Sequence, residues 1–336
     1  VDKTAPSSQF EEVRDGMARE LGAGGPDRAS REGVSLTPLE VETDETSRRY
    51  SFVSLENGDD SRVVDLVVNL PEEAGPVGAE AIREAGAGWW FFQALRELDD
   101  ALLHLRVNRP GVNLVLFRVR GKVEVALEAD AAMETEGDWF LDEVRFFAGR
   151  VFKRMDMTAK TFFALADEGT AFAGTWLEPA LAADRLYVLD DPEVEVGLGL
   201  SKANLGAYLM GNGLSRLETR FLGDEETLAK VAANLGPVPA SRTEELGLAT
   251  EAMDAIDWED EIRVHVEERA SYSPDALTGM EANLRFAGPE TLETKIFGRL
   301  TAWQNWIFQR PNAVGENGAL QRYGTPIRPE FDYSRT

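Results

Sequence analysis

The segment from Phe162 to Asp184 has the residue types and spacing that could stabilise a developing negative charge. Its sequence, FFALADEGTAFAGTWLEPALAAD, predicts a buried strand, a turn of small residues and a helix that begins directly afterwards. Backbone N–H groups at the start of a helix have no partner within the helix, and the helix dipole adds partial positive charge there. Such N–H groups can hold an oxyanion without any side chain.

The same segment resembles the crotonases, the superfamily that includes the enoyl-CoA hydratases. Members typically have a strand, a Gly-rich turn and then Glu-Leu-Ala-x-x-x-Asp, and this chain has GTAFAG at 169–174 followed by EPALAAD at 178–184. Crotonases bind acyl-CoA thioesters and stabilise an enolate-like oxyanion with two backbone N–H groups. The resemblance implies that Gly174 supplies one of them, although Ala173 and Thr175 stand where glycines are usual.

In crotonases the second oxyanion donor comes from a turn that follows an earlier strand. The matching stretch here is VALEAD at 125–130, after the strand expected at 113–119. The resemblance places Leu127 at the donor position. Glu128 replaces the usual glycine, and this replacement narrows the backbone freedom of the expected turn.

The resemblance also implies positions for an acid and a base. Glu178 matches one of the two family glutamates, while Lys202 stands where the second carboxylate is expected. A lysine is protonated near neutral pH unless it is buried, so Lys202 cannot simply replace a base. Lys202 could instead contact a CoA phosphate or be a solvated surface charge. Glu178 could likewise have no catalytic role and only stabilise the first turn of its helix through the helix dipole.

The C-terminal stretch narrows the resemblance to the benzoyl-CoA-dihydrodiol lyases. Residues 275–324 look like the end of those proteins, and so do GWWFFQALRELDDA at 88–101 and AFAGTWLEPALAADR at 171–185. This family opens the ring of 2,3-epoxybenzoyl-CoA in aerobic benzoate degradation, giving 3,4-dehydroadipyl-CoA semialdehyde and formate. CoA is part of the substrate, and no metal or redox cofactor is implied.

In that family a first crotonase-like half precedes the region matched here. The implied partners are therefore an acyl-CoA thioester and an upstream crotonase-like half, fused or separate, in a homo-oligomer. Two alternatives stay open. This half could be a catalytically degenerate scaffold or dimerisation module, or the chain could be a generic hydratase that uses Glu178 alone.

Alternating strand and helix patterns predict the elements that position these residues. Strands are expected at 49–55, 62–70, 113–119, 162–167 and 185–189, and helices at 88–106 and 140–154. This order favours an α/β domain with largely parallel strands, and the resemblance implies the crotonase spiral of ββα units. We expect a tail helix and linker over 1–31, the core over 32–223 and a helical region over 224–336. Aromatic residues near Trp303 and Trp306 are typical of an interface.

Composition excludes several classes of function. The chain has no cysteine and two histidines, which excludes thiolate and His-rich metal sites. A net charge of -25 repels nucleic acids and anionic lipid surfaces. No apolar stretch approaches the length of a spanning helix, and the N-terminus lacks a secretion-signal pattern. We therefore expect a cytoplasmic location, with neither nucleic-acid nor membrane partners.

Overall fold

The computed structural model describes residues 3–23, 33–58, 60–285 and 288–334, and the chain divides into two units. The first unit, Val1–Leu36, contains the 3-10 helix η1 (Ser7–Gln9) and helix α1 (Phe10–Ala23). None of the residues of α1 is buried within this unit. The helix expected at the N-terminus is confirmed, while most of the linker expected to follow it lies outside the described residues.

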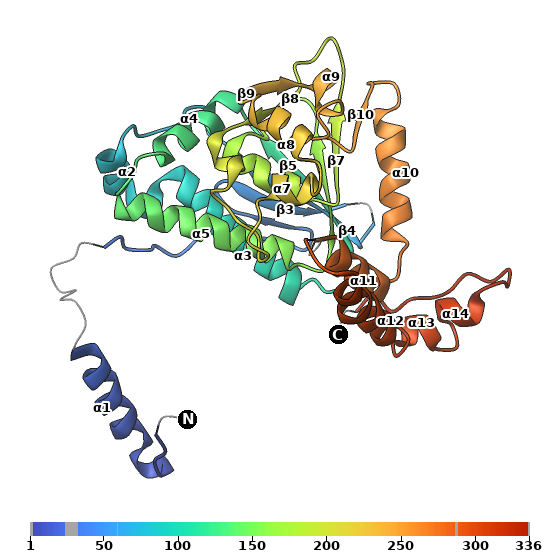
Figure 1. Ribbon diagram of the computed structural model, residues 1–336, viewed down its shortest axis with the longest axis horizontal. Coiled ribbons are helices and arrows are strands. Elements are labelled where there is room, and N and C mark those ends of the chain that lie inside the picture. Colours follow the sequence, from blue (N-terminus) through green and yellow to red (C-terminus); the bar gives the residue numbers. More distant parts are fainter. Residues whose placement is uncertain (1–2, 24–32, 59, 286–287, 335–336) are drawn as a thin grey trace. The chain divides into compact units, whose positions relative to one another are not determined.

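The second unit, Thr37–Thr336, is built around an eight-stranded sheet (Figure 1). The strand order is β1-β2-β3-β4-β5-β6-β7-β10, with antiparallel pairing from β1 to β4 and parallel pairing from β4 onward. The strands are β1 (Glu42–Thr43), β2 (Ser47–Arg49), β3 (Val53–Asn57), β4 (Val63–Asn69), β5 (Leu114–Arg120), β6 (Thr161–Ala166), β7 (Arg185–Leu189) and β10 (Glu251–Met253). The expected α/β fold with largely parallel strands is confirmed.

A second sheet contains two antiparallel strands, β8 (Gly197–Leu200) and β9 (Gly236–Pro239). Two details differ from the sequence-based expectation. The single strand expected at 49–55 is wrong, because Tyr50 N donates to Val53 O at 2.8 Å in a tight turn that separates β2 from β3. The region after residue 224 also contributes strands, and β10 pairs with β7 in the main sheet.

Helices follow the strands in alternation. They are α2 (Ala79–Ala85), η2 (Gly86–Gly88), α3 (Trp90–Val107), α4 (Val123–Met133), α5 (Trp139–Asp156), η3 (Gly174–Leu177), α6 (Glu178–Ala182), η4 (Lys202–Leu205), α7 (Arg216–Arg220), α8 (Glu225–Ala232), α9 (Ala240–Thr243), α10 (Trp258–Ala270), α11 (Pro274–Arg285), the π-helical η5 (Thr294–Leu300), α12 (Thr301–Ile307), α13 (Pro311–Val314) and α14 (Ala319–Arg322). None of the helices in the described ranges combines the length and apolar character required to cross a bilayer.

Helices α3 and α5 pack against each other, and α3 also contacts β3. The sequence forms α3 because apolar residues recur at helical spacing, which buries Leu95, Leu98 and Leu102 on one face. Asp138 is the N-cap of helix α5, and its carboxylate accepts hydrogen bonds from two backbone N–H groups of the first turn. These two long helices therefore fix the layer that lies beside the candidate site.

Helix α10 packs on one face of the main sheet. Ile262 joins a buried apolar cluster with Val63, Leu116 and Leu165, which come from three neighbouring strands. Successive side chains of a strand point to opposite faces, so Val64 in β4 faces away from this cluster. Both faces of the central strands are thus buried, as is typical of parallel sheets, and all six residues of β6 are buried.

Candidate active site

The bend that leads from β6 into η3 and α6 is built from small residues. Gly174 has a φ of +51°, in the left-handed region that glycine adopts without steric cost. Ala173 forms a parallel bridge with Gly199 of β8, and Gly199 N donates to Phe172 O at 2.9 Å. The bend is therefore anchored against the second sheet, and the whole segment from Ala171 to Leu181 is buried.

The carboxylate of Asp130, from α4, lies against this bend. Its Oδ2 accepts hydrogen bonds from Thr175 N at 2.9 Å and from Ser201 Oγ at 2.6 Å. Its Oδ1 accepts a hydrogen bond from Thr175 Oγ1 at 2.6 Å. A Cβ atom added at Gly174 would lie 1.9 Å from Asp130 Oδ2, so only glycine permits this approach. An amide of the bend is thus already bonded to a carboxylate of the chain.

Burial dominates the electrostatics of Asp130. Loss of hydration raises the pKa of its carboxyl group to about 6, because a buried environment disfavours the charged form. The hydrogen bonds from Ser201 and Thr175 act in the opposite direction, and the nearby charge of Glu134 raises the pKa further. Asp130 therefore lies on the Thr175 amide, one residue after Gly174, whose N–H is the expected oxyanion donor.

Gly174 lies at the bend as expected, but Leu127 does not lie in a turn. The turn expected at 125–130 is wrong, because these residues belong to α4. Helix α4 is rich in Ala and Glu, which favour helix, and it has no glycine to interrupt it. Leu127 is the fifth residue of α4, where a helical N–H group points to the carbonyl four residues earlier. Its assignment as a donor stays a prediction that this placement does not support.

The carboxylate of Glu178 is buried and engaged at both oxygens. Oε1 accepts a hydrogen bond from Asn204 Nδ2 at 2.8 Å, and Oε2 accepts one from Arg216 Nη1 at 2.9 Å. Arg216 also donates to Asp156 Oδ2 at 2.7 Å and to the carbonyl of Tyr208. Burial raises the pKa of Glu178, while the Arg216 charge and the hydrogen bonds lower it. Glu178 is therefore a counter-ion of a buried arginine in this structure.

Lys202 lies at the surface. Its side chain is 70% exposed, and Nζ forms an ion pair with Glu134 Oε2 at 2.7 Å. Asn204, two residues further on, is the residue of η4 that reaches Glu178 and the carbonyl of Gly174. The segment in which crotonases place a second carboxylate therefore contributes an amide to the site.

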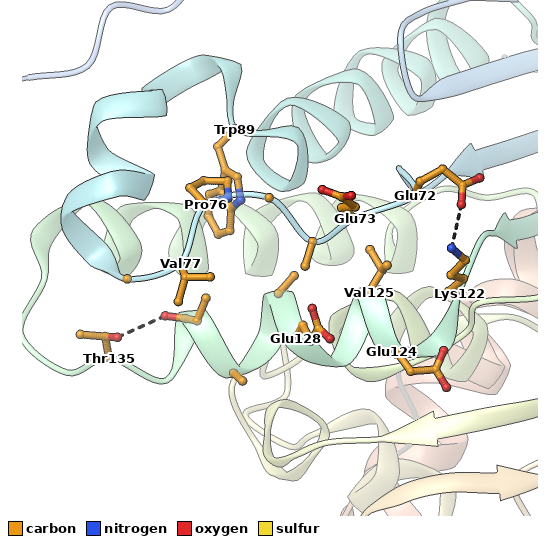
Figure 2. Close-up of a pocket in the computed structure, with 16 residues that line it drawn as sticks. Glu72, Glu73, Pro76, Val77, Trp89, Lys122, Glu124, Val125, Glu128 and Thr135 are labelled. Atoms are coloured by element: carbon orange, nitrogen blue, oxygen red, sulfur yellow. Dashed lines mark hydrogen bonds and ion pairs between the residues drawn. The ribbon is translucent and has the colours of Figure 1, made fainter.

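A groove of about 840 Å³ lies between the loop at 72–78 and α4 (Figure 2). Trp89 and Val125 form part of its apolar lining. Among the residues that line it, Lys122 is the one basic side chain, and it forms an ion pair with Glu72 at 2.8 Å. Three further carboxylates line the groove, from Glu73, Glu124 and Glu128. The groove therefore has a surplus of negative charge, which disfavours phosphate groups.

Sequence reasoning missed the residues that fill the site. Asp130 is the last residue of VALEAD, for which the sequence predicts a turn. A helix prediction for the same residues would have given Asp130 a different position relative to the bend. Arg216, in SRLETR, carries no local signal of its buried carboxylate partners, which are 38 and 60 residues away in sequence. The one sequence signal for Asn204 as a site residue is its place two residues after Lys202, in the segment expected to supply an acid or base.

Neither histidine lies in a metal-binding cluster. Within the described ranges, no group of three or more His, Asp or Glu side chains could hold a metal ion. His265 Nε2 lies 4.0 Å from Glu261 Oε2, and the imidazole stacks on Tyr187. These contacts give His265 a packing role between α10 and β7.

Comparisons with known proteins identify the fold and a relative that matches this chain from end to end. The chain is 45% identical over 338 residues to the benzoyl-CoA-dihydrodiol lyase of Aromatoleum evansii, a match that covers 100% of this chain and 61% of that protein. The chain thus spans about three fifths of the length of this relative. No protein-family model matches the chain.

Solved enoyl-CoA hydratases have the same fold at low identity. The enzyme from Geobacillus kaustophilus HTA426 superposes with a TM-score of 0.61 and 13% identity, covering 86% of this chain and 99% of that one. The enzyme from Mycobacterium smegmatis gives a TM-score of 0.59 and 14% identity, covering 83% and 98%. The chain therefore has the crotonase fold of the enoyl-CoA hydratases and is homologous, along its whole length, to part of a benzoyl-CoA-dihydrodiol lyase.

Proposed function

We propose that this chain is the crotonase-fold supporting half of an acyl-CoA lyase that opens the ring of 2,3-epoxybenzoyl-CoA. The products would be 3,4-dehydroadipyl-CoA semialdehyde and formate, with CoA as part of the substrate and no further cofactor. The chemistry itself would take place in an upstream crotonase-like half, fused or separate. The name of the relative and its greater length support this assignment. We expect the complete protein to be a cytoplasmic homo-oligomer.

The observation that carries the supporting role is the carboxylate of Asp130 on the Thr175 amide. An oxyanion bound at this amide would lie beside an ionised carboxylate. Two unit charges about 4 Å apart repel by about 4 kcal/mol at the effective dielectric constant of a protein. Protonation of Asp130, whose pKa is about 6, would relieve this repulsion for about 1.4 kcal/mol at pH 7, so the penalty corresponds to about a tenfold loss in rate.

The contacts of Glu178 support the same conclusion. A general base must reach the proton that it removes, yet both oxygens of Glu178 are engaged by Asn204 and Arg216. Freeing the carboxylate would leave the buried guanidinium without one of its two counter-ions, which is energetically unfavourable. We assign Glu178 to the stability of this half.

The test uses the complete gene product and follows formate release from 2,3-epoxybenzoyl-CoA. Glu178→Gln should keep kcat within about threefold of the unchanged protein if the protein stays folded, since no proton transfer is lost. Glu134→Gln, an exposed charge removal, is the matched control. A fall in kcat of about a hundredfold or more in Glu178→Gln alone, as for a lost general base, would refute the supporting role.

A second measurement addresses binding by this half. Titration of benzoyl-CoA into the purified chain of residues 1–336 should release no heat, because the groove beside α4 repels phosphates and the bend is filled. Micromolar binding would instead favour the alternative in which this half is an active hydratase that uses Glu178.

A further inference from the structure

A pocket of about 200 Å³ lies beside the C-terminal end of α6, and no step of the proposed reaction uses it. It is bordered by the end of α5, by α6 and by parts of α7 and α11. Three arginines line it, namely Arg216, Arg220 and Arg285, and two aspartates accompany them. The pairing of these charges decides what the pocket can bind.

Two of the three arginines have carboxylate partners. Arg216 contacts Glu178 and Asp156 at 2.9 and 2.7 Å. Arg285 contacts Asp184 Oδ2 at 2.8 Å and Glu281 Oε2 at 2.9 Å. Their positive charges are therefore compensated within the protein.

Arg220 differs from both. Its Nε donates to the carbonyl of Gly247 at 2.6 Å, and within the described part of the chain no carboxylate forms an ion pair with its guanidinium. Burial lowers the pKa of Arg220, and no neighbouring charge contributes to this shift. The guanidinium of Arg220 is thus partly buried, and the polar partner of its Nε is a backbone carbonyl. Buried charges are normally paired, which favours an external counter-ion.

We propose that this pocket binds a small monocarboxylate with a short apolar tail. The carboxylate would accept hydrogen bonds from the Nη groups of Arg220, since planar guanidinium and carboxylate groups match in geometry. Asp156 and Asp184 also line the pocket and disfavour a dianion such as phosphate. The apolar tail would contact Leu181 and Leu284, which form part of the wall.

Calorimetric titration of sodium propionate into the complete protein tests the proposal, at constant ionic strength set with sodium chloride. We expect millimolar affinity for propionate and no binding of propionamide, its neutral isostere. Arg220→Gln should weaken binding by at least about tenfold, the lower end of the loss from one charged hydrogen-bonding group. Arg242→Gln removes the same charge from an exposed position and should bind propionate like the unchanged protein.

Absence of binding to the unchanged protein would overturn the proposal. Equal affinity in the two substituted proteins would overturn it as well, because the ion would then bind elsewhere. Arg220→Lys keeps the charge and guards against loss of the fold in Arg220→Gln, and it should bind propionate with intermediate affinity. The catalytic assay has no part in this test, so failure here leaves the proposed function standing.

Discussion

Asp130 offers the sharpest test of the structure, because its protonation should couple to folding. Burial raises its pKa from the ordinary 3.8 to about 6. A group whose pKa is higher in the folded state binds protons preferentially there. Its contribution to stability is present below about pH 4 and is lost as the pH rises through about 6. In full, the shift corresponds to about 3 kcal/mol at 1.36 kcal/mol per pH unit.

The part of this stability change that can be measured lies in a pH range in which the protein can stay folded. Between about pH 5 and pH 7, linkage with these two pKa values gives a loss of about 1.3 kcal/mol from Asp130 alone. The asparagine in Asp130→Asn cannot titrate. The free energy of unfolding of this variant should therefore not fall by this amount between the two pH values, while the contributions of other groups are kept.

Urea unfolding of both proteins at the two pH values provides the assay, and the double difference isolates Asp130. Glu128→Gln removes a carboxylate from the exposed side of α4 and serves as the control, with a pH dependence like that of the unchanged protein. A double difference near zero for Asp130→Asn would mean that the carboxylate is not held in a buried site, and the filled bend would then be refuted.

Three further substitutions test the site. Gly174→Ala should unfold the protein or destabilise it by several kcal/mol, since the added Cβ would meet Asp130 Oδ2 at 1.9 Å, and thermal unfolding would show this; a stable variant would contradict the bend geometry. Arg216→Met should cost about 3–5 kcal/mol at pH 7 because it leaves Glu178 uncompensated, and the cost should shrink at lower pH in urea titrations. Lys202→Gln should change stability by at most about 0.5 kcal/mol, as expected for an exposed ion pair, and a larger change would show that Lys202 has a buried role.

Local patterns were sufficient to predict most of the fold. The strand expected at 185–189 is β7 (Arg185–Leu189), and the long amphipathic helix is α3, within one or two residues at each end. These elements bury apolar side chains at regular spacing, so the pattern and the structure report the same burial. The tight turn that splits 49–55 was missed because its residues carry no glycine or proline signal.

The local structure at the site was predictable from the sequence, but the contacts between distant segments were not. The sequence placed Gly174 at a bend and Glu178 at a helix start, because both depend on neighbouring residues. What faces them depends on packing between elements that are distant in sequence: Asp130 lies 45 residues before Thr175, and Arg216 lies 38 residues after Glu178. Hydrophobic periodicity contains no information about such polar partners, so the contacts of Asp130 and Arg216 could not be predicted from it.

In the proposed supporting half, the bend pairs its Thr175 amide with a carboxylate of the same chain. A working site must leave its amide donors available in the free enzyme, and an unsatisfied buried amide costs about 1–3 kcal/mol. Here the Thr175 amide is satisfied by Asp130, so the chain gains stability where an enzyme would accept strain. Replacing Asp130 with glycine would expose the amide again, yet it would not rebuild a second donor, because Leu127 lies inside α4. That substitution should therefore lower stability without producing hydratase activity, and detectable hydration of an enoyl-CoA by the variant would contradict the assignment of this half as a support.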